Sequence, residues 1–468
     1  MSRTHRSRLL AVPTAMAALA AALAPSAQAT TSPPALATSV ANAVTYVKGL
    51  QDANGHFVTT GLSNEWAFSG LAAAGTAAAD VLPAAPNNTS AYNARLVYRG
   101  DLSAAGWPGA SPVATDYERA TLNAYSAGID PARVSPGRNL IADIAAAWQT
   151  ASPGYWGSPS LFNGTVFGLL ALSAAKTPSG AQRVPQALLN TSIQTVRNNQ
   201  HTDGGWNYPK AEGVPAQLAA VSDIDMTGAA MASLCQAGVP STDSAIVAAK
   251  SFLKGKLVAT TGAFNSSFGA NTDSNGWAVS GLNACGIPSQ GTDFTTSSGA
   301  TPIDFLVGQQ VSGGGFRYTT GTTPNAYASL DALRALAGGA FSATPPTPST
   351  PGEPRFVGST AFASGTTSKL ALVVDDGSGT LKVCAVPVSP TTSTTTLGTV
   401  LTAATTSATP SGCVSGFSPA SGTITTVNGV ANAGTSSWKV SVDGATAAAA
   451  ATTTTIGVGD TIALTYGS

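Results

Sequence analysis

The chain has 468 residues, of which 43% are hydrophobic, and its 22 basic and 22 acidic side chains cancel. That length suffices for two or three domains with sizeable cores. Charged residues make up only 9% of the chain. This argues against a nucleic-acid partner, because such binding relies on Lys and Arg neutralising phosphates. It equally disfavours a polybasic membrane-binding patch.

The first residues predict export. Three arginines lie among the first eight residues, an apolar run covers 9–24, and Ala27-Gln28-Ala29 offers a small-x-small cleavage pattern. We therefore expect residues 1–29 to be a signal peptide. An N-terminal membrane anchor is the alternative, but the run is shorter than the about 20 residues that a span needs. We expect a secreted, extracellular protein that is not an integral membrane protein after cleavage; the sequence does not indicate its oligomeric state.

One pattern recurs six times, at spacings of roughly fifty residues, the length of a two-helix repeat. Each copy has a Gly-rich turn with an aromatic residue, a polar stretch, and a helix of small and apolar residues. These helices are expected around 66–75, 120–128, 167–172, 227–234, 277–284 and 328–336. Amphipathic helical patterns lie between them, for example over 37–50, 137–149, 187–198 and 244–257. Two concentric rings follow, an all-α (α6/α6) toroid over 30–340, with an open solenoid as the alternative.

After residue 340 the composition changes. Residues 341–354 are rich in Pro, Thr and Ser and predict an extended linker. Beyond it, over 355–468, β-branched runs separated by Asp-Gly and Asn-Gly turns predict a small, mainly-β domain. Its strands are expected at 370–374, 381–386, 423–427, 438–442 and 462–466. The chain is thus expected to be multidomain.

The four cysteines divide between the two parts. Export permits disulfides, and four cysteines allow three pairings. Cys235 and Cys285 fall in the helical part and Cys384 and Cys413 in the β part, so we predict those two pairs. A zinc site is not expected, because no His lies beside any Cys.

The repeat turns resemble a known family. Gln51-x3-Gly55-His56-Phe57, Gln200-x3-Gly204-Gly205-Trp206 and Gln310-x3-Gly314-Gly315-Phe316 are similar to the Gln-x-Gly-aromatic signature of the squalene cyclase and prenyltransferase repeat family. That family is an α/α toroid, so the resemblance implies the same fold as the periodicity.

The C-terminal part resembles the β domain of transcobalamin and intrinsic factor. The matching residues are Val427-Asn428-Gly429, Trp438-Lys439-Val440-Ser441-Val442-Asp443-Gly444, Val458-Gly459-Asp460-Thr461-Ile462 and Tyr466. A toroid joined to this domain is the architecture of the cobalamin carriers, in which the ligand sits between the two domains. The stretch from Asp225 to Cys235 is also similar to those carriers. However, the cobalt-ligating His that some of them place just before it is absent from 218–222.

Polar or acidic residues open each inner helix. N-capping explains any one of them, because a capping side chain satisfies orphan N–H groups and negative charge is favoured at that end. The repeats nevertheless place all six helix starts at one end of the ring, where they would form a polar mouth. Aromatic residues in the first turns fit either ligand contact or core packing. The predicted ligand-binding residues are Glu65, Trp66, Asp116, Tyr117, Asn163, Asp223, Asp225, Asp273, Asn275, Trp277, Asn325, Tyr327 and, in the β domain, Trp438.

An enzyme is the main alternative. Asp223-Ile224-Asp225-Met226-Thr227 is similar to the Asp-x-Asp-Asp-Thr motif of squalene-type cyclases, whose middle Asp protonates an alkene. Asp225 matches that acid and Asp223 its neighbour, but Met226 replaces the adjacent carboxylate, which weakens the support for the acid. Aromatic residues, which stabilise carbocations, are only 7% of the chain. Carbohydrate-processing barrels, with Asp116 and Glu118 as candidates, are a further possibility.

On balance, the sequence favours binding over catalysis. We expect a secreted small-molecule binding protein, with no required cofactor, that clasps a ligand between the toroid mouth and the β domain. A corrinoid such as cobalamin is the leading ligand from the resemblance. The alternatives are a terpene cyclase or prenyltransferase-type enzyme, of isomerase or lyase type, and an extracellular surface or adhesion module.

Overall fold

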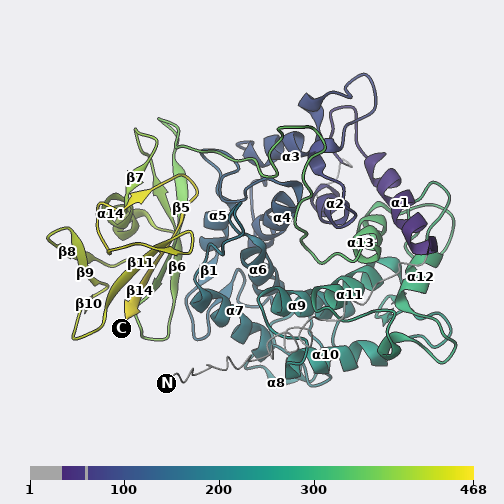
Figure 1. Ribbon diagram of the computed structural model, residues 1–468. Coiled ribbons are helices and arrows are strands. Elements are labelled where there is room, and N and C mark those ends of the chain that lie inside the picture. Colours follow the sequence, from purple (N-terminus) through teal and green to yellow (C-terminus); the bar gives the residue numbers. More distant parts are fainter. Residues whose placement is uncertain (1–33, 58–61) are drawn as a thin grey trace, which may run out of the picture.

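The computed structural model describes residues 34–57 and 62–468, with side chains in the second segment described from Trp66 onward. The predicted signal peptide, residues 1–29, lies outside the described residues. A helical part is followed by a β part, as predicted (Figure 1). The helices are α1 Pro34–Lys48, α2 Leu62–Ala73, α3 Ala94–Ser103, α4 Ala114–Ala127, α5 Leu140–Ala145, α6 Asn163–Ala174, α7 Gln186–Asn198, α8 Pro215–Leu218, α9 Ile224–Gln236, α10 Ser244–Gly255, α11 Thr272–Ala284, α12 Pro302–Gly308, α13 Ala326–Leu336 and α14 Leu397–Ser407.

Six inner helices close into a ring. Helices α2, α4, α6, α9, α11 and α13 each pack on the next, and α13 packs on α2 (Figure 1). Small residues allow this close approach: a Cβ added to Gly228 of α9 would lie 2.4 Å from the Trp277 carbonyl oxygen of α11. Likewise a Cβ on Gly276 would lie 2.9 Å from the backbone of Asp331 in α13. Each of these contacts joins the second turns of two helices, so these neighbours are parallel and in register.

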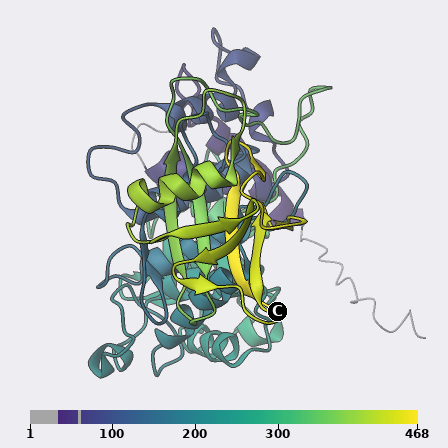
Figure 2. The same ribbon diagram turned by 90° about the vertical axis from the view of Figure 1, so that its left-hand side faces the viewer.

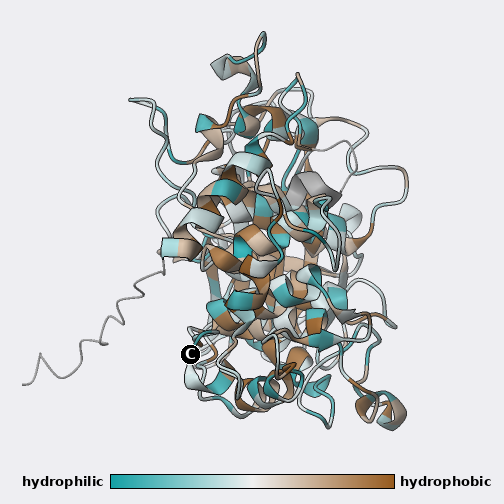
Figure 3. Ribbon diagram, turned by 90° about the vertical axis from the view of Figure 1, so that its right-hand side faces the viewer, coloured by the Kyte–Doolittle hydropathy of each residue, from teal (hydrophilic) through white to brown (hydrophobic). Residues whose placement is uncertain are grey.

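Helices α1, α3, α5, α7, α10 and α12 surround this ring (Figure 1). Figure 3 shows the side remote from the β part, where hydrophilic and hydrophobic residues interleave along the helices, as amphipathic outer helices require. The repeat turns hold them together. Gln200 Nε2 donates to Gly204 O within its own turn and to Ala245 O of α10, both at 2.8 Å. The glutamine of the repeat signature is therefore a structural residue that links successive hairpins.

The β part is built on one five-stranded sheet, in the order β12-β11-β14-β5-β6, with β14 and β5 parallel and the other pairs antiparallel. Figure 2 shows α14 crossing the face of the sheet that is turned away from the ring. The strands are β1 Trp148–Gln149, β2 Tyr155–Trp156, β3 Asn265–Ser266, β4 Gly269–Ala270, β5 Ser368–Asp375, β6 Lys382–Val388, β7 Thr395–Thr396, β8 Phe417–Ala420, β9 Thr423–Val427, β10 Val430–Ala431, β11 Ser437–Val442, β12 Ala445–Thr446, β13 Thr455–Ile456 and β14 Thr461–Gly467. Helix α14 was not predicted, because its Thr-rich sequence has low intrinsic helix propensity. Its buried Leu397, Val400 and Leu401 pack on the sheet and override that preference.

The two faces of this sheet belong to different cores. Leu372 and Val374 of β5 join the core beneath α14, whereas Ala371 and Val373, which alternate with them, join the core of the helical ring. Helix α5 packs on β5 and β6. The β part is therefore fixed against the outer wall of the ring by a shared apolar core.

The Pro-rich stretch that follows α13 is packed onto the ring rather than extended in solvent. Phe341 is fully buried, and the Ala343 N–H donates to Ser126 Oγ of α4 at 3.1 Å. Further on, the buried Arg95 pairs with Glu353 at 2.7 Å. This stretch closes the end of the ring where the inner helices finish.

Both predicted disulfides are present. Cys235 pairs with Cys285, joining the ends of the neighbouring inner helices α9 and α11. Cys384 pairs with Cys413 inside the β part.

Candidate acid site at the mouth of the ring

The mouth is the end of the ring where the six inner helices begin. Three of them bring carboxylates together there: Asp225 of α9, Asp273 of α11 and Asp331 of α13, named here the acid cluster. Asp225 and Asp273 lie in the first turn of their helices and are half-buried, whereas Asp331 lies a turn deeper and is buried. Because α9, α11 and α13 are consecutive around the ring, the three acids share one side of the mouth.

The fold keeps the Asp225 carboxyl protonated well above its ordinary range, up to near neutral pH. Burial, followed by the charge of Asp223, raises its pKa to about 7, despite a hydrogen bond with Ser274 that acts in the opposite direction. Its Oδ1 is shielded from solvent and has no hydrogen-bond partner among the described residues. An isolated buried oxygen favours the neutral form, because nothing compensates a charge there. The carboxyl group is thus able to donate a proton to a bound molecule.

Asp273 and Asp331 form a proton-sharing pair. Burial, the charge of Asp331 and the hydrogen bond between the two carboxyls together raise the pKa of Asp273 to about 9. Arg334, fully buried in the same helix as Asp331, places Nη2 2.5 Å from Asp331 Oδ1. The guanidinium thus lies against Asp331, and its charge lowers the pKa of Asp273 without outweighing burial and Asp331.

Four aromatic side chains, named here the aromatic floor, fill the ring below these acids. Trp66 of α2, Phe167 of α6, Trp277 of α11 and Phe341 all contact one another, with ring centroids 4.9–6.2 Å apart. Trp277 follows Asp273 by four residues on one helix, a rise of about 6 Å. The Arg334 guanidinium lies 5.1 Å from the centroid of Trp66 and 4.5 Å from that of Phe341. It thereby joins the acid cluster to the floor.

An apolar rim surrounds the mouth. The loops that precede the inner helices carry exposed large hydrophobic side chains: Val113, Leu161, Tyr208, Val221, Phe268 and Tyr318. The Phe162 N–H donates to Tyr208 O at 2.7 Å and the Thr272 N–H to Tyr318 O at 2.8 Å, which fixes the two tyrosines beside the starts of α6 and α11. The charges of Asp225 and Asp273 help burial to raise the pKa of both tyrosines. Exposed apolar side chains gathered around one opening indicate a binding surface.

Several predicted binding residues are instead structural. Asp223 and Asn325 are N-caps, accepting from the N–H groups of Met226 and Ala328 at 2.9 Å. Asp116 accepts from the Val113 N–H at 2.9 Å and pairs with Arg119. Asn163 Oδ1 accepts from the Gly164 N–H at 3.0 Å, at the start of α6. Asp116, Asp223 and Asn325 thus have the capping role, whereas Asn163 bonds only the adjacent N–H and the N-cap of α6 is Phe162.

Other predicted residues lie away from the acid cluster. Asn275 is fully buried and bonds to both backbone groups of Phe264. Tyr117 packs edge-on against Trp107, while Tyr327 is 38% exposed at the start of α13. Trp438 was predicted to contact ligand, but it is buried in the β part's own core beside Tyr466, where its indole N–H donates to Val430 O. The side chain of Glu65 lies outside the described part of the chain.

Glu118 is a further acid in the ring, and its pairing with Asp116 for sugar chemistry is not seen. It is fully buried, and neither of its carboxylate oxygens has a hydrogen-bond partner in the described structure. Burial raises its pKa well above the usual range, so the group is neutral. Asp116 is partly exposed and accepts from the Val113 N–H at the start of α4. The two therefore differ in environment and do not form an accessible carboxylate pair.

Sequence reasoning missed Asp331, Arg334, Phe341, Tyr208 and Tyr318. A signal for the first two was present, since both are charged residues within the otherwise apolar inner helix α13. Phe341 and the tyrosines lie in loops, where the sequence carries no periodicity. Within residues 34–57 and 62–468 there is no cluster of His, Cys, Asp and Glu suited to a metal. No helix in that part is long and apolar enough to cross a bilayer.

No known family profile and no curated protein matches this chain. Solved structures with a similar fold include the type II terpene cyclase MstE from Scytonema, at 15% identity and a TM-score of 0.45, covering 65% of this chain and 98% of that one. The ent-copalyl diphosphate synthase from Streptomyces platensis has 17% identity and a TM-score of 0.40, covering 59% of this chain and 49% of that one. The Candida albicans protein geranylgeranyltransferase-I has 14% identity and a TM-score of 0.36, covering 64% and 83%.

The expectation of a corrinoid carrier is wrong. The solved structures similar to the ring, which include terpene cyclases, a prenyltransferase and a glycosidase, show its fold alone and give no support to a corrinoid ligand. In addition, the predicted clasp needs the β domain to face the mouth across a flexible linker. The β part is instead packed on the outer wall at α5 (Figure 1), and the linker is packed onto the ring. Trp438, the predicted contact from that domain, is buried inside it.

Proposed function

We propose that this protein is an enzyme that protonates a neutral, unsaturated isoprenoid chain at the mouth of the ring, with Asp225 as the general acid. The observation that carries this proposal is the position of Asp225, half-buried beside Asp273 and Asp331 and above the aromatic floor, with an Oδ1 that is shielded from solvent and has no hydrogen-bond partner among the described residues. Proton donation to an alkene needs an acid that remains protonated in an apolar site. Asp225, whose pKa is raised to about 7, meets that requirement near neutral pH.

The neighbouring helices supply the support that the local sequence lacks. Met226, which occupies the place of the second carboxylate in the cyclase motif, is fully buried in the core. Asp273 and Asp331 provide carboxyl groups from α11 and α13 instead. A proton leaving Asp225 creates an anion close to a positive centre on the substrate, and the ring of the floor residue Trp277 offers further stabilisation of positive charge.

The surroundings of the mouth favour a neutral, apolar substrate. The rim residues Leu161, Tyr208, Phe268 and Tyr318 offer apolar contact outside the ring. An anionic group such as a diphosphate would face the acid cluster. Because the carboxyls of the cluster become negatively charged as the pH rises, they would repel it. The sequence-predicted export belongs to the same proposal, since two disulfides suit an oxidising compartment.

The experiment is to incubate the purified protein with squalene and with geranylgeranyl-substituted arenes at pH 6 and to analyse the products by mass spectrometry. Conversion to a cyclic isomer is expected, and Asp225→Asn should lower the rate by about 10²-fold or more, the contribution of a general acid. Asp243→Asn is the matched control, because Asp243 caps the outer helix α10 and pairs with Arg197, and it is not part of the acid cluster. Absence of conversion with every neutral polyene, or equal rates for both variants, contradicts the proposal.

A further inference from the structure

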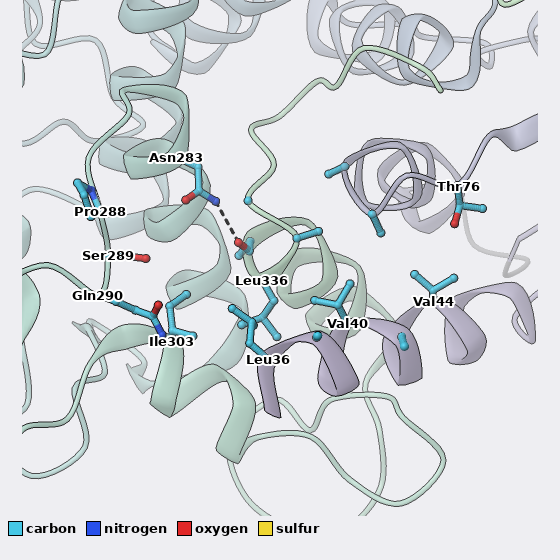
Figure 4. A pocket seen from close by; sticks show the side chains of 17 residues that line it. Leu36, Val40, Val44, Thr76, Asn283, Pro288, Ser289, Gln290, Ile303 and Leu336 are labelled. Carbon is cyan, nitrogen blue, oxygen red and sulfur yellow. Dashed lines mark hydrogen bonds between the residues drawn. The ribbon is translucent and has the colours of Figure 1, made fainter. Parts of the chain in front are cut away.

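A second cavity lies at the other end of the ring, where the inner helices finish. It has a volume of about 740 Å³ and lies between α1 and the last turns of α2, α11 and α13 (Figure 4). Such a volume is typical of small-molecule sites. Leu36 of α1 lies beside Leu336 of α13 and Ile303 of α12, Val40 and Val44 follow along α1, and together they form an apolar wall. The aromatic floor, which includes Phe341, separates this cavity from the acid cluster.

The polar groups of the cavity are neutral: Thr76, Ser289 and Gln290 can donate as well as accept, and the ends of two helices add further acceptors. None of its 17 lining residues is charged. Helices α2 and α13 both end at the cavity, at Ala73 and Leu336, so their carbonyl ends bring partial negative charge to it. Asn283 uses its Nδ2 to bond the Ala335 and Gly339 carbonyls at 3.0 and 3.1 Å, and this orientation leaves Oδ1 as the acceptor of that side chain.

We propose that this cavity binds a neutral aliphatic alcohol, with its chain along α1 and its hydroxyl group donating to the acceptors at the helix ends. The chemistry of the lining selects the head group. A hydroxyl supplies the donor that the carbonyl ends require, whereas a carboxylate or phosphate would meet the negative end of two helix dipoles with no cation to compensate it. The valine and leucine stripe of α1, at spacings of four residues, provides the apolar contact for the chain.

The experiment measures binding of 1-dodecanol, dodecanoate and dodecyl phosphate to the intact protein by calorimetry at pH 7.5. We expect the alcohol to bind at one site, about tenfold or more tightly than either anion. Ala37→Trp and Ala41→Phe should weaken this binding by about tenfold or more. Both alanines line the cavity from exposed positions of α1, so larger side chains there fill it without entering the core.

Thr38→Trp is the matched control, because Thr38 is equally exposed on α1 and does not line the cavity; it should bind the alcohol like the wild type. Equal binding of the three amphiphiles, or undiminished binding by both Ala37→Trp and Ala41→Phe, overturns the proposal. The measurement is independent of catalysis, since Asp225→Asn should leave it unchanged.

Discussion

Arg183 of the helical ring and Asp443 of the β part face each other across the interface between the two, with Arg183 Nη1 2.6 Å from Asp443 Oδ2. The same guanidinium donates through Nη2 to Asp130 at 2.7 Å and is fully buried. Arg133 adds bonds to Asp443 and Asp460 at 3.1 and 2.8 Å. These ion pairs add to the shared apolar core, and together they hold the β part against the ring.

Replacement of the buried guanidinium should loosen this interface. Arg183→Met leaves Asp130 and Asp443 without their closest cation, and loss of one partner of a buried pair costs about 3–5 kcal/mol. Urea unfolding of the mature protein measures the loss. The control is Arg197→Met, whose pair with Asp243 is partly exposed, so its cost should stay below about 1 kcal/mol. Equal effects of the two variants would contradict a structural role for the network.

Asp225 should make the protein less stable as the pH rises. The fold raises its pKa from an ordinary value of 3.8 to about 7, so the folded state binds a proton more tightly than the unfolded state. Its favourable contribution is complete below pH 3.8 and is lost as the pH rises to 7. Asp225→Asn, which mimics the protonated acid, should therefore leave stability unchanged at pH 3.5 and raise it by about 1 kcal/mol or more at pH 8.

Thermal unfolding at the two pH values tests this expectation, with Asp243→Asn as the variant that should bring no gain at pH 8. The proposed activity should decline as the pH rises through 7, because only the protonated Asp225 can donate. A stability gain that is equal at both pH values would show that the carboxyl is not protonated in the fold.

The periodic features of the sequence predicted most of the fold. The inner helices were identified from runs of small residues, and Thr423–Val427 has the bounds that its β-branched run predicted. The acid cluster was only half predicted. Asp225 and Asp273 lie in recognisable helix starts, but their raised pKa values depend on Asp331 and on burial, which only ring closure creates. The low aromatic content was also misleading, because Trp66, Phe167, Trp277 and Phe341 come from four distant segments to one place.

The charge of Arg334 should lower the pKa of Asp273. Its charge lowers the pKa of Asp273 against the larger effects of burial and Asp331, so Arg334→Met should move that pKa higher still. Carboxyl NMR titration of Asp273 measures the shift. Arg334→Lys is the matched control: it keeps the charge near Asp331 but loses the planar stacking on Trp66 and Phe341. A titration unchanged in Arg334→Met would mean that the guanidinium does not act on the acid pair.

The two disulfides should differ in their contribution to stability, and burial should outweigh loop length. Cys235 and Cys285 are 50 residues apart and Cys384 and Cys413 are 29 apart; loop entropy alone would favour the first by about 0.5 kcal/mol. The second pair, however, is buried in the β core while the first is half-buried, and loss of each buried sulfur costs about 1 kcal/mol in packing. Replacing Cys384 and Cys413 together by Ala should therefore lower the free energy of unfolding more than replacing Cys235 and Cys285 together. Urea unfolding of the two variants measures the difference. A larger loss for the Cys235–Cys285 pair would make loop entropy the dominant effect.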